Sequence, residues 1–194
     1  MSGRFPTAGR NLPVSRSWPG GPAAFAGPRH HVSMDATALA RSLLEPVPAH
    51  RTAGLTVLRA IDGAAEVAVE APGVLGNVIG SLHSSGLATL VDAAALAAIL
   101  SAGDAPGELD GVLPLGASAS FEYLAPARGR LIASCKLSSS AVQVLRPVLA
   151  GTADRARIST QGVVTDERHA VVCRGGFEWS VRRVTRTARI RPGG

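Results

Sequence analysis

The segment LATLVDAAALAAIL, residues 87–100, is apolar on nearly every side of the helix that its residues favour. In a globular protein such a helix has to be enclosed by other elements, because one laid on a surface needs a polar face. Its many alanines allow neighbouring strands to approach closely. The sequence therefore predicts a helix over residues 84–101 with a strongly curved sheet wrapped around it.

The pattern of the remaining segments predicts an α+β fold with one antiparallel sheet. Proline, glycine and alternating apolar residues divide the chain into elements. The expected elements are a helix from Asp35 to Leu44, ended by Pro46 and Pro48; a hairpin around Asp62-Gly63; a Gly-rich connection, 72–80; two strands within 117–137, joined at 127–129; a short helix, 140–150, kinked or ended by Pro147; and strands over 155–165 and 170–182.

The positive charge of the chain lies in its two ends. Residues 1–33 and 181–194 hold nine arginines and no acid, which leaves eleven basic against fourteen acidic residues between them. The first segment is rich in proline and glycine, so we expect a disordered basic tail over 1–33, a folded domain over 34–182 and a second basic tail over 183–194. Basic residues without interleaved aromatics do not predict specific nucleic-acid binding.

Two cysteines, Cys135 and Cys173, are too few for a disulfide framework and are expected to be reduced apolar fillers. The chain has no apolar run long enough to span a membrane and no signal-peptide pattern, so we expect a cytoplasmic protein without membrane association. No set of His, Cys and acidic residues has metal-ligand spacing. We expect His50 and His169 to be loop residues, and Phe177 and Trp179 to belong to the core.

Asp92 is the single ionisable residue in the predicted enclosed helix. Burying a carboxylate without a partner costs several kcal/mol or shifts its pKa, so its presence requires an explanation. Ser85, Thr89 and Asp92 recur at spacings of four and three and therefore share one stripe of the helix. Either the carboxylate is satisfied by serine or backbone donors, or it performs chemistry.

The sequence SLHSSG, residues 81–86, leads into this helix. Ser84 or Ser85 is expected to be the N-cap, and the free N–H groups of the first turn favour negative charge. They either cap the helix only or stabilise an oxyanion that develops on a substrate carbonyl. Ser84, His83 and Asp92 contain the residue types of a hydrolase triad, but no GxSxG elbow is present.

The run NVIGSLHSSGLATLVDAA, residues 77–94, resembles the signature of hotdog-fold acyl-CoA thioesterases of the PaaI-like type. That family has an Asn, a His-Gly-Gly turn and a helix Asp at this spacing, which match Asn77, His83 and Asp92. Ser84 and Ser85 stand where the family has its paired glycines. The flanking hairpin and FEYLAPARGRL also resemble the family, so the resemblance covers roughly residues 50–182.

The resemblance implies a hotdog fold and hydrolysis of an acyl-CoA or related thioester to a free acid and a thiol. Asp92 would be the general base or the nucleophile, Asn77 would orient the carbonyl or water, and the turn from His83 to Ser85 would polarise the carbonyl. Gly86, Thr89 and, from a partner subunit, Ser118 would bind substrate. No cofactor is expected, because coenzyme A enters as part of the substrate.

The resemblance also implies a homodimer or a dimer of dimers with its active sites at the interface. An exposed sheet edge is a liability unless it is paired, which favours such an assembly. Two other interpretations remain open. One is a non-catalytic module that binds acyl-CoA or lipid, which the serines at 84 and 85 favour. The other is a structural dimer without a ligand, which leaves Asp92 and Asn77 unexplained.

Overall fold

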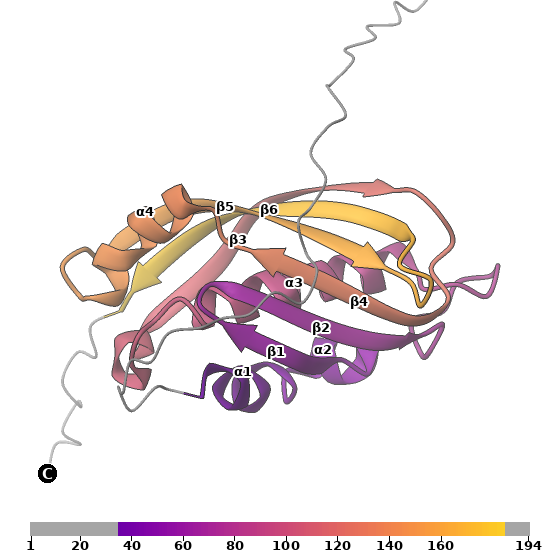
Figure 1. Ribbon diagram of the computed structural model, residues 1–194, viewed down its shortest axis with the longest axis horizontal. Helices are drawn as coiled ribbons and strands as arrows, with labels where there is room; N and C mark the ends of the chain where they lie inside the picture. The colour runs from indigo at the N-terminus through magenta and orange to yellow at the C-terminus, as the bar shows by residue number, and fades with distance from the viewer. Residues whose placement is uncertain (1–34, 185–194) are drawn as a thin grey trace, which may run out of the picture. The chain divides into compact units, whose positions relative to one another are not determined.

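The structure is a computed structural model that describes residues 35–184. One antiparallel sheet of six strands, in the order β1-β2-β4-β5-β6-β3, curves around helix α3 (Figure 1). The strands are β1 (Thr56–Ile61), β2 (Ala64–Ala71), β3 (Val112–Tyr123), β4 (Gly129–Lys136), β5 (Arg155–Thr165) and β6 (Val171–Arg183). The helices are α1 (Ala36–Leu44), α2 (Pro48–Ala53), α3 (Ser84–Leu100) and α4 (Ser139–Leu149), with a 3-10 turn at Pro106–Leu109.

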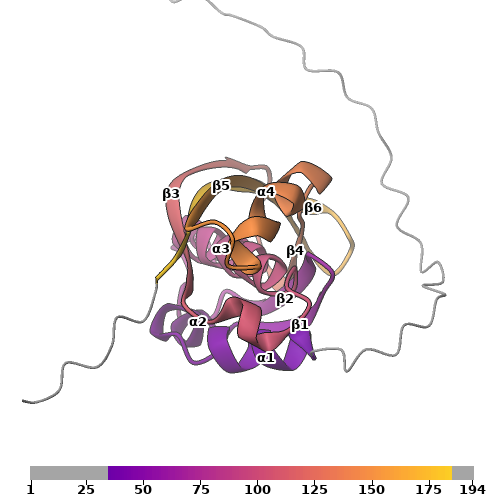
Figure 2. The same ribbon diagram turned by 90° about the vertical axis from the view of Figure 1, so that its left-hand side faces the viewer.

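The enclosure of α3 confirms the predicted α+β architecture. Figure 2 shows this helix inside the curve of the sheet, with α1 and α2 on the side of β1. Ala93, Ala94 and Ala97 have no solvent exposure. On the sheet, Gly162 of β5 faces the helix so closely that an added Cβ would lie 3.1 Å from Val91 Cγ1. Small residues on both sides therefore bring helix and sheet together, as the alanine content indicated.

The two edges of the sheet differ. Side chains of α1 and of Glu45, which follows it, bind the backbone of the β1 edge strand. Thr37 Oγ1 accepts from Ala60 N–H at 3.0 Å, Arg41 Nε donates to Val57 O at 2.9 Å, and Glu45 Oε1 accepts from Val57 N–H at 3.0 Å. At the other edge, β3 is the last strand, and within residues 35–184 no strand pairs with its outer side. One edge is therefore covered, and the other is open for pairing.

Three local predictions differ from the structure. The segment after Pro46 forms the additional helix α2, whose N-terminal Pro48 is compatible with a first turn. The first of the two strands predicted within 117–137 begins earlier, at Val112; in the sheet β3 pairs with β6, and β4 lies between β2 and β5. Strand β6 continues to Arg183, one residue into the predicted C-terminal tail.

The proposed tails lie largely beyond the residues that the structure describes. Residues 1–33 and 185–194 are outside it, so the predictions of basic disordered tails stay predictions. None of the helices within 35–184 combines the length and apolar character that crossing a bilayer requires.

Candidate active site

His83, rather than Ser84 or Ser85, is the N-cap of α3. The Ser85 backbone N–H donates to His83 Nδ1 at 3.2 Å, and Ser85 Oγ lies 2.9 Å from the same nitrogen. Because a backbone N–H can only donate, Nδ1 acts as an acceptor and the ring hydrogen belongs on Nε2. His83, Ser84 and Ser85 are all exposed, so the first turn of α3 is accessible.

Asn77 organises the loop that precedes α3. Its Oδ1 accepts from the N–H groups of Ile79 and Ser81, each at 3.1 Å, and its Nδ2 donates to Ser81 Oγ at 2.9 Å. The Arg128 guanidinium also stabilises this loop, because it donates hydrogen bonds to the carbonyls of Ile79 and Gly80. In this chain the Asn77 amide therefore holds the turn.

The predicted stripe of Ser85, Thr89 and Asp92 is present on α3. Thr89 Oγ1 donates to Ser85 O at 2.9 Å, and Thr89 and Asp92 lie on the wall of one open cleft of about 240 Å³. Ala49 and His50 of α2, Ala88 of α3 and Phe177 of β6 complete the lining. The Asp92 side chain is 30% exposed. Its carboxylate is thus accessible from a cleft whose walls are otherwise largely apolar.

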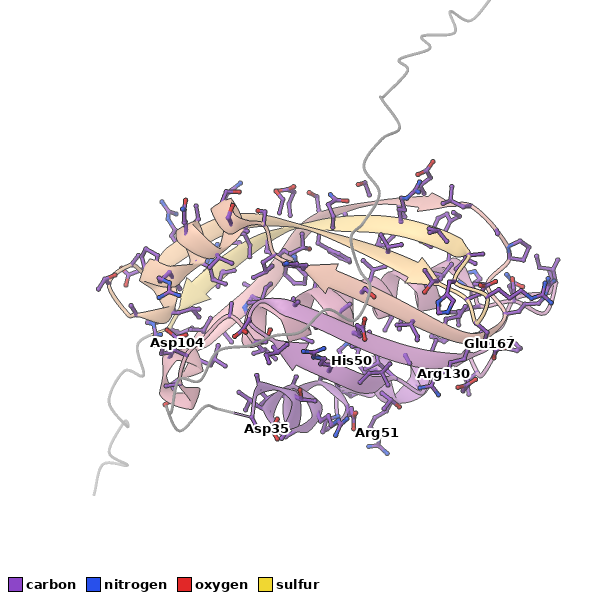
Figure 3. All side chains as sticks on the ribbon, in the orientation of Figure 1. Asp35, His50, Arg51, Asp104, Arg130 and Glu167 are labelled. Carbon is purple, nitrogen blue, oxygen red and sulfur yellow. The ribbon has the colours of Figure 1, made fainter. Side chains whose placement is uncertain are left out.

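His50 is the partner that the structure gives Asp92 within residues 35–184. His50 Nε2 lies 3.8 Å from Asp92 Oδ2, and His50 Nδ1 lies 2.7 Å from Leu44 O. The prediction that His50 is a loop residue is wrong, because it belongs to α2 and is only 3% exposed. Figure 3 shows His50 toward the middle of the domain and its neighbour Arg51 at the margin.

Interaction with the Asp92 carboxylate raises the pKa of His50 above its usual value of 6.5. Burial opposes this shift, because a charged ring loses solvation, and the Leu44 carbonyl adds to it. The protonated form of His50 is therefore favoured more than that of a free histidine. His50 was missed by the sequence analysis because α2 is only six residues long and no pattern within it points toward α3.

Phe177 extends an aromatic row from the core to the cleft. Its ring centroid lies 5.3 Å from that of Trp179 and 5.6 Å from that of Phe121. Trp179 is 2% exposed, which confirms its assignment to the core, and its Nε1 donates to Thr160 Oγ1 at 2.8 Å. Phe177 is only partly buried and forms one wall of the cleft, so the sequence missed its place beside Asp92.

Ser118 and Gly86 occupy places that the sequence did not indicate. Ser118 pairs with Glu178, and because directly opposed residues share a face, its side chain lies on the outer side of the sheet, opposite the side that Phe177 faces. Its assignment to a substrate site concerned a partner subunit and stays a prediction. Gly86 is buried, and an added Cβ would lie 2.7 Å from Leu82 Cδ1, so the glycine accommodates that side chain.

The predicted site residues thus form separate groups within the chain. Asn77 contacts Ser81, His83 contacts Ser85, and Asp92 contacts His50. The stripe connects the second and third groups through Thr89. Within residues 35–184, no three His, Cys, Asp or Glu side chains form a cluster suited to a metal ion.

Comparison with solved structures places this fold among known proteins. A protein of unknown function from Pseudomonas aeruginosa, described as a probable thioesterase, aligns with a TM-score of 0.63 and 24% identity over 76% of this chain and 96% of its own. A thioesterase family protein from Silicibacter pomeroyi aligns with a TM-score of 0.60 and 14% identity over 77% of this chain and 99% of its own.

The PaaI protein of E. coli, from the phenylacetic acid degradation operon, aligns with a TM-score of 0.57 and 15% identity over 80% of this chain and 97% of its own. No family model matches the sequence, and no curated protein matches it. At these identities the likeness concerns the fold. The helix-wrapped domain of residues 35–184 therefore has the hotdog fold shared by thioesterase-superfamily proteins, PaaI among them.

Proposed function

We propose that this protein hydrolyses an acyl-CoA or related thioester to a free acid and a thiol. The observation that carries the proposal is the Asp92 carboxylate, which lies partly exposed on a cleft wall formed otherwise by Ala49, Ala88, Phe177, Thr89 and His50. An apolar cleft with few polar groups suits an acyl chain that ends in one reactive carbonyl. The likeness to thioesterase-superfamily structures supports the same reaction type.

In this reaction Asp92 takes a proton from water, and the resulting hydroxyl forms a bond to the thioester carbonyl carbon. The C–S bond then breaks, and the proton that Asp92 took from water passes to the sulfur, which leaves as a thiol. Asp92 as nucleophile is the alternative: its oxygen attacks the carbonyl carbon, the C–S bond breaks to release a thiolate, and water then cleaves the resulting anhydride, giving a hydroxyl to the acyl group and a proton to the thiolate. In both routes the backbone N–H groups in the first turn of an α3 helix stabilise the carbonyl oxygen as it becomes negative.

The site needs a second copy of the chain. Asp92 lies seven positions after Ser85 on α3, which is about 10 Å along the helix axis. A homodimer that lays two α3 helices side by side in opposite directions would bring Asp92 of one chain near the first turn of the other. The open outer edge of β3 supports such pairing, because the β1 edge is already occupied by α1. Two such dimers would give the expected dimer of dimers.

The proposal includes no cofactor, because coenzyme A is part of the substrate and Asp92 supplies the base. We also assign the reaction to the cytoplasm. Cys135 and Cys173 are both buried and free. Burial raises the pKa of the Cys135 thiol to about 12, so it persists as an unreactive thiol. Free cysteines of this kind fit a reducing compartment.

The decisive experiment is release of thiol from acyl-CoA substrates of several chain lengths. We expect Asp92→Asn to lower kcat by about 10² to 10⁴, because it removes the general base or nucleophile. Asp104→Asn is the matched control, since Asp104 is exposed and pairs with Arg146 away from the cleft. Equal turnover by wild type and Asp92→Asn would refute the assigned role.

A binding module without catalysis is the second candidate. Ser84 and Ser85 favour it, because each places a side chain beside the accessible first turn, where glycine would let a thioester approach the backbone. In that case acyl-CoA would bind tightly to wild type and to Asp92→Asn alike, without release of thiol from either. Isothermal titration with the intact thioester, followed by analysis of the recovered ligand, separates the two functions.

A further inference from the structure

The hydrogen-bond partner of His50 Nδ1 fixes where its ring hydrogen lies. Nδ1 is 2.7 Å from Leu44 O, and a carbonyl oxygen can only accept. The hydrogen therefore belongs on Nδ1. His50 is 3% exposed, so α1, α2 and α3 leave its ring little freedom to turn over. This assignment is opposite to that of His83, whose Nδ1 accepts from a backbone N–H.

The other nitrogen of the ring, Nε2, faces Asp92 Oδ2 at 3.8 Å. In neutral His50 this nitrogen would present a lone pair to a carboxylate oxygen, and the two acceptors would repel each other. An added proton on Nε2 makes the contact attractive. A protonated His50 beside an ionised Asp92 forms a neutral pair, which costs less in a largely apolar cleft than an isolated carboxylate.

We propose that His50 is a positioning residue for Asp92: its imidazolium holds Oδ2, which leaves Oδ1 to act on water or on the thioester. The catalytic part of this inference rests on the proposed function. It adds a side chain from α2 to a site otherwise built on α3 and its preceding loop. It also explains how an acidic residue is retained in a helix that is otherwise so apolar.

No competing charge surrounds this pair in the described part of the chain. The cleft receives Asp92 and Thr89 from α3 and Phe177 from β6, while α1 contributes the Leu44 carbonyl. Glu45, which follows α1, is engaged with Val57 N–H. Asp92 is the charged group that raises the His50 pKa. As pH rises through that pKa, Nε2 loses its proton, the repulsion returns, and Asp92 is no longer held.

An NMR titration tests the pair without requiring turnover. The His50 imidazole signals, assigned by their absence from His50→Gln, would be followed against pH in wild type and in Asp92→Asn. We expect a lower His50 pKa in Asp92→Asn, because the carboxylate that favours the imidazolium is gone. An unchanged pKa would overturn the proposal. Because this readout does not depend on the reaction, its result stands even if the protein cleaves no thioester.

Kinetics then test the catalytic consequence. His50→Gln keeps a neutral donor near the position of Nε2, whereas His50→Asn retains an amide near the Leu44 carbonyl that does not reach Asp92. We expect kcat of His50→Asn to fall roughly ten- to a hundredfold, with less loss in His50→Gln and little change in KM. The decline of kcat at alkaline pH in wild type should be absent from His50→Gln.

His169→Asn is the control, because His169 is exposed in a turn with a positive φ of 62° that asparagine also adopts. Thermal unfolding of each variant identifies loss of folding. Wild-type kcat and pH profiles in both folded His50 variants would overturn the positioning role. Absence of thioester cleavage by wild type, with a His50 pKa that still depends on Asp92, would instead reject the proposed function and retain the pair.

Discussion

At the scale of single residues, the pairing of His50 with Asp92 connects folding stability to pH. Asp92 raises the pKa of His50, with the Leu44 carbonyl adding to the effect and burial opposing it. A group whose folded pKa exceeds its unfolded pKa stabilises the fold while it is protonated. This contribution is fully present below the unfolded pKa of about 6.5 and is lost as pH rises through the higher folded value.

We therefore expect Asp92→Asn to change the pH dependence of stability. Wild type should exceed the variant in free energy of unfolding at slightly acidic pH, and the difference should shrink as pH becomes alkaline. Urea unfolding at a series of pH values measures it. Asp104→Asn is the control and should follow the wild-type profile, because Asp104 pairs with an exposed arginine. A difference between wild type and Asp92→Asn that stays constant with pH would contradict the pairing.

The sequence predicted one member of this pair and not the other, for a physical reason. Asp92 is a carboxylate within an otherwise apolar helical segment, and this exception can be recognised from the sequence of that one segment. His50 is not such an exception. Its role depends on how α2 packs against α3, which brings together residues far apart in the sequence. The place of Phe177 on the cleft wall could not be predicted either, because the alternation of residues in a strand does not show where a cleft opens.

At the scale of elements, Arg183 fastens three segments at one end of the sheet. Its Nε donates to Val148 O at 2.8 Å, its Nη1 to Asp110 O at 2.9 Å, and its Nη2 to Leu149 O at 2.7 Å and to Glu108 O. These carbonyls belong to the end of α4 and to the 3-10 turn and its following residue. A single side chain of β6 therefore donates to carbonyls at the C-terminal ends of α4 and of the 3-10 turn.

Arg183→Ala should reduce the free energy of unfolding by about 1.5–3 kcal/mol, because it leaves partly buried carbonyls without a charged donor. Chemical denaturation measures the loss. Arg182→Ala is the matched control, since Arg182 is exposed and its guanidinium bonds, within residues 35–184, only to Ser180 Oγ at 3.3 Å. Equal stability of the two variants would show that solvent replaces the Arg183 contacts at no cost.

The pairing of the elements was harder to predict than the elements themselves. Alternating apolar residues predicted most of the strands, and the Asp62-Gly63 turn predicted the β1–β2 hairpin. Strands β3 and β4 follow each other along the chain, yet they lie apart in the sheet. Strands β5 and β6, which come later in the chain, lie between them, so their placement depends on segments outside the connection.

At the largest scale, the two edges of the sheet differ in whether they can pair with another strand. Thr37, Arg41 and Glu45 of the α1 segment bind the backbone of β1 and block pairing there. Strand β3 has twelve residues, several of them exposed and apolar, such as Leu113, Leu115 and Tyr123. A long edge of this kind favours association with another strand, and a second copy of the same chain would bury it symmetrically.

Ala119→Lys tests this assembly together with the shared site. Ala119 is exposed on β3 and pairs with Phe177, so its side chain lies on the face of the sheet that carries the cleft. A lysine there should leave the folded domain intact but place a charge in the interface, which converts dimer to monomer in sedimentation experiments. Turnover should fall as the dimer dissociates, because Asp92 then lacks the first turn of a second α3.

Thr56→Lys is the control. Thr56 is exposed on the covered β1 edge, so this variant should remain dimeric and active. If Ala119→Lys becomes monomeric and keeps wild-type kcat, each chain contains a complete site, and the antiparallel arrangement of the two helices is not the one that catalyses.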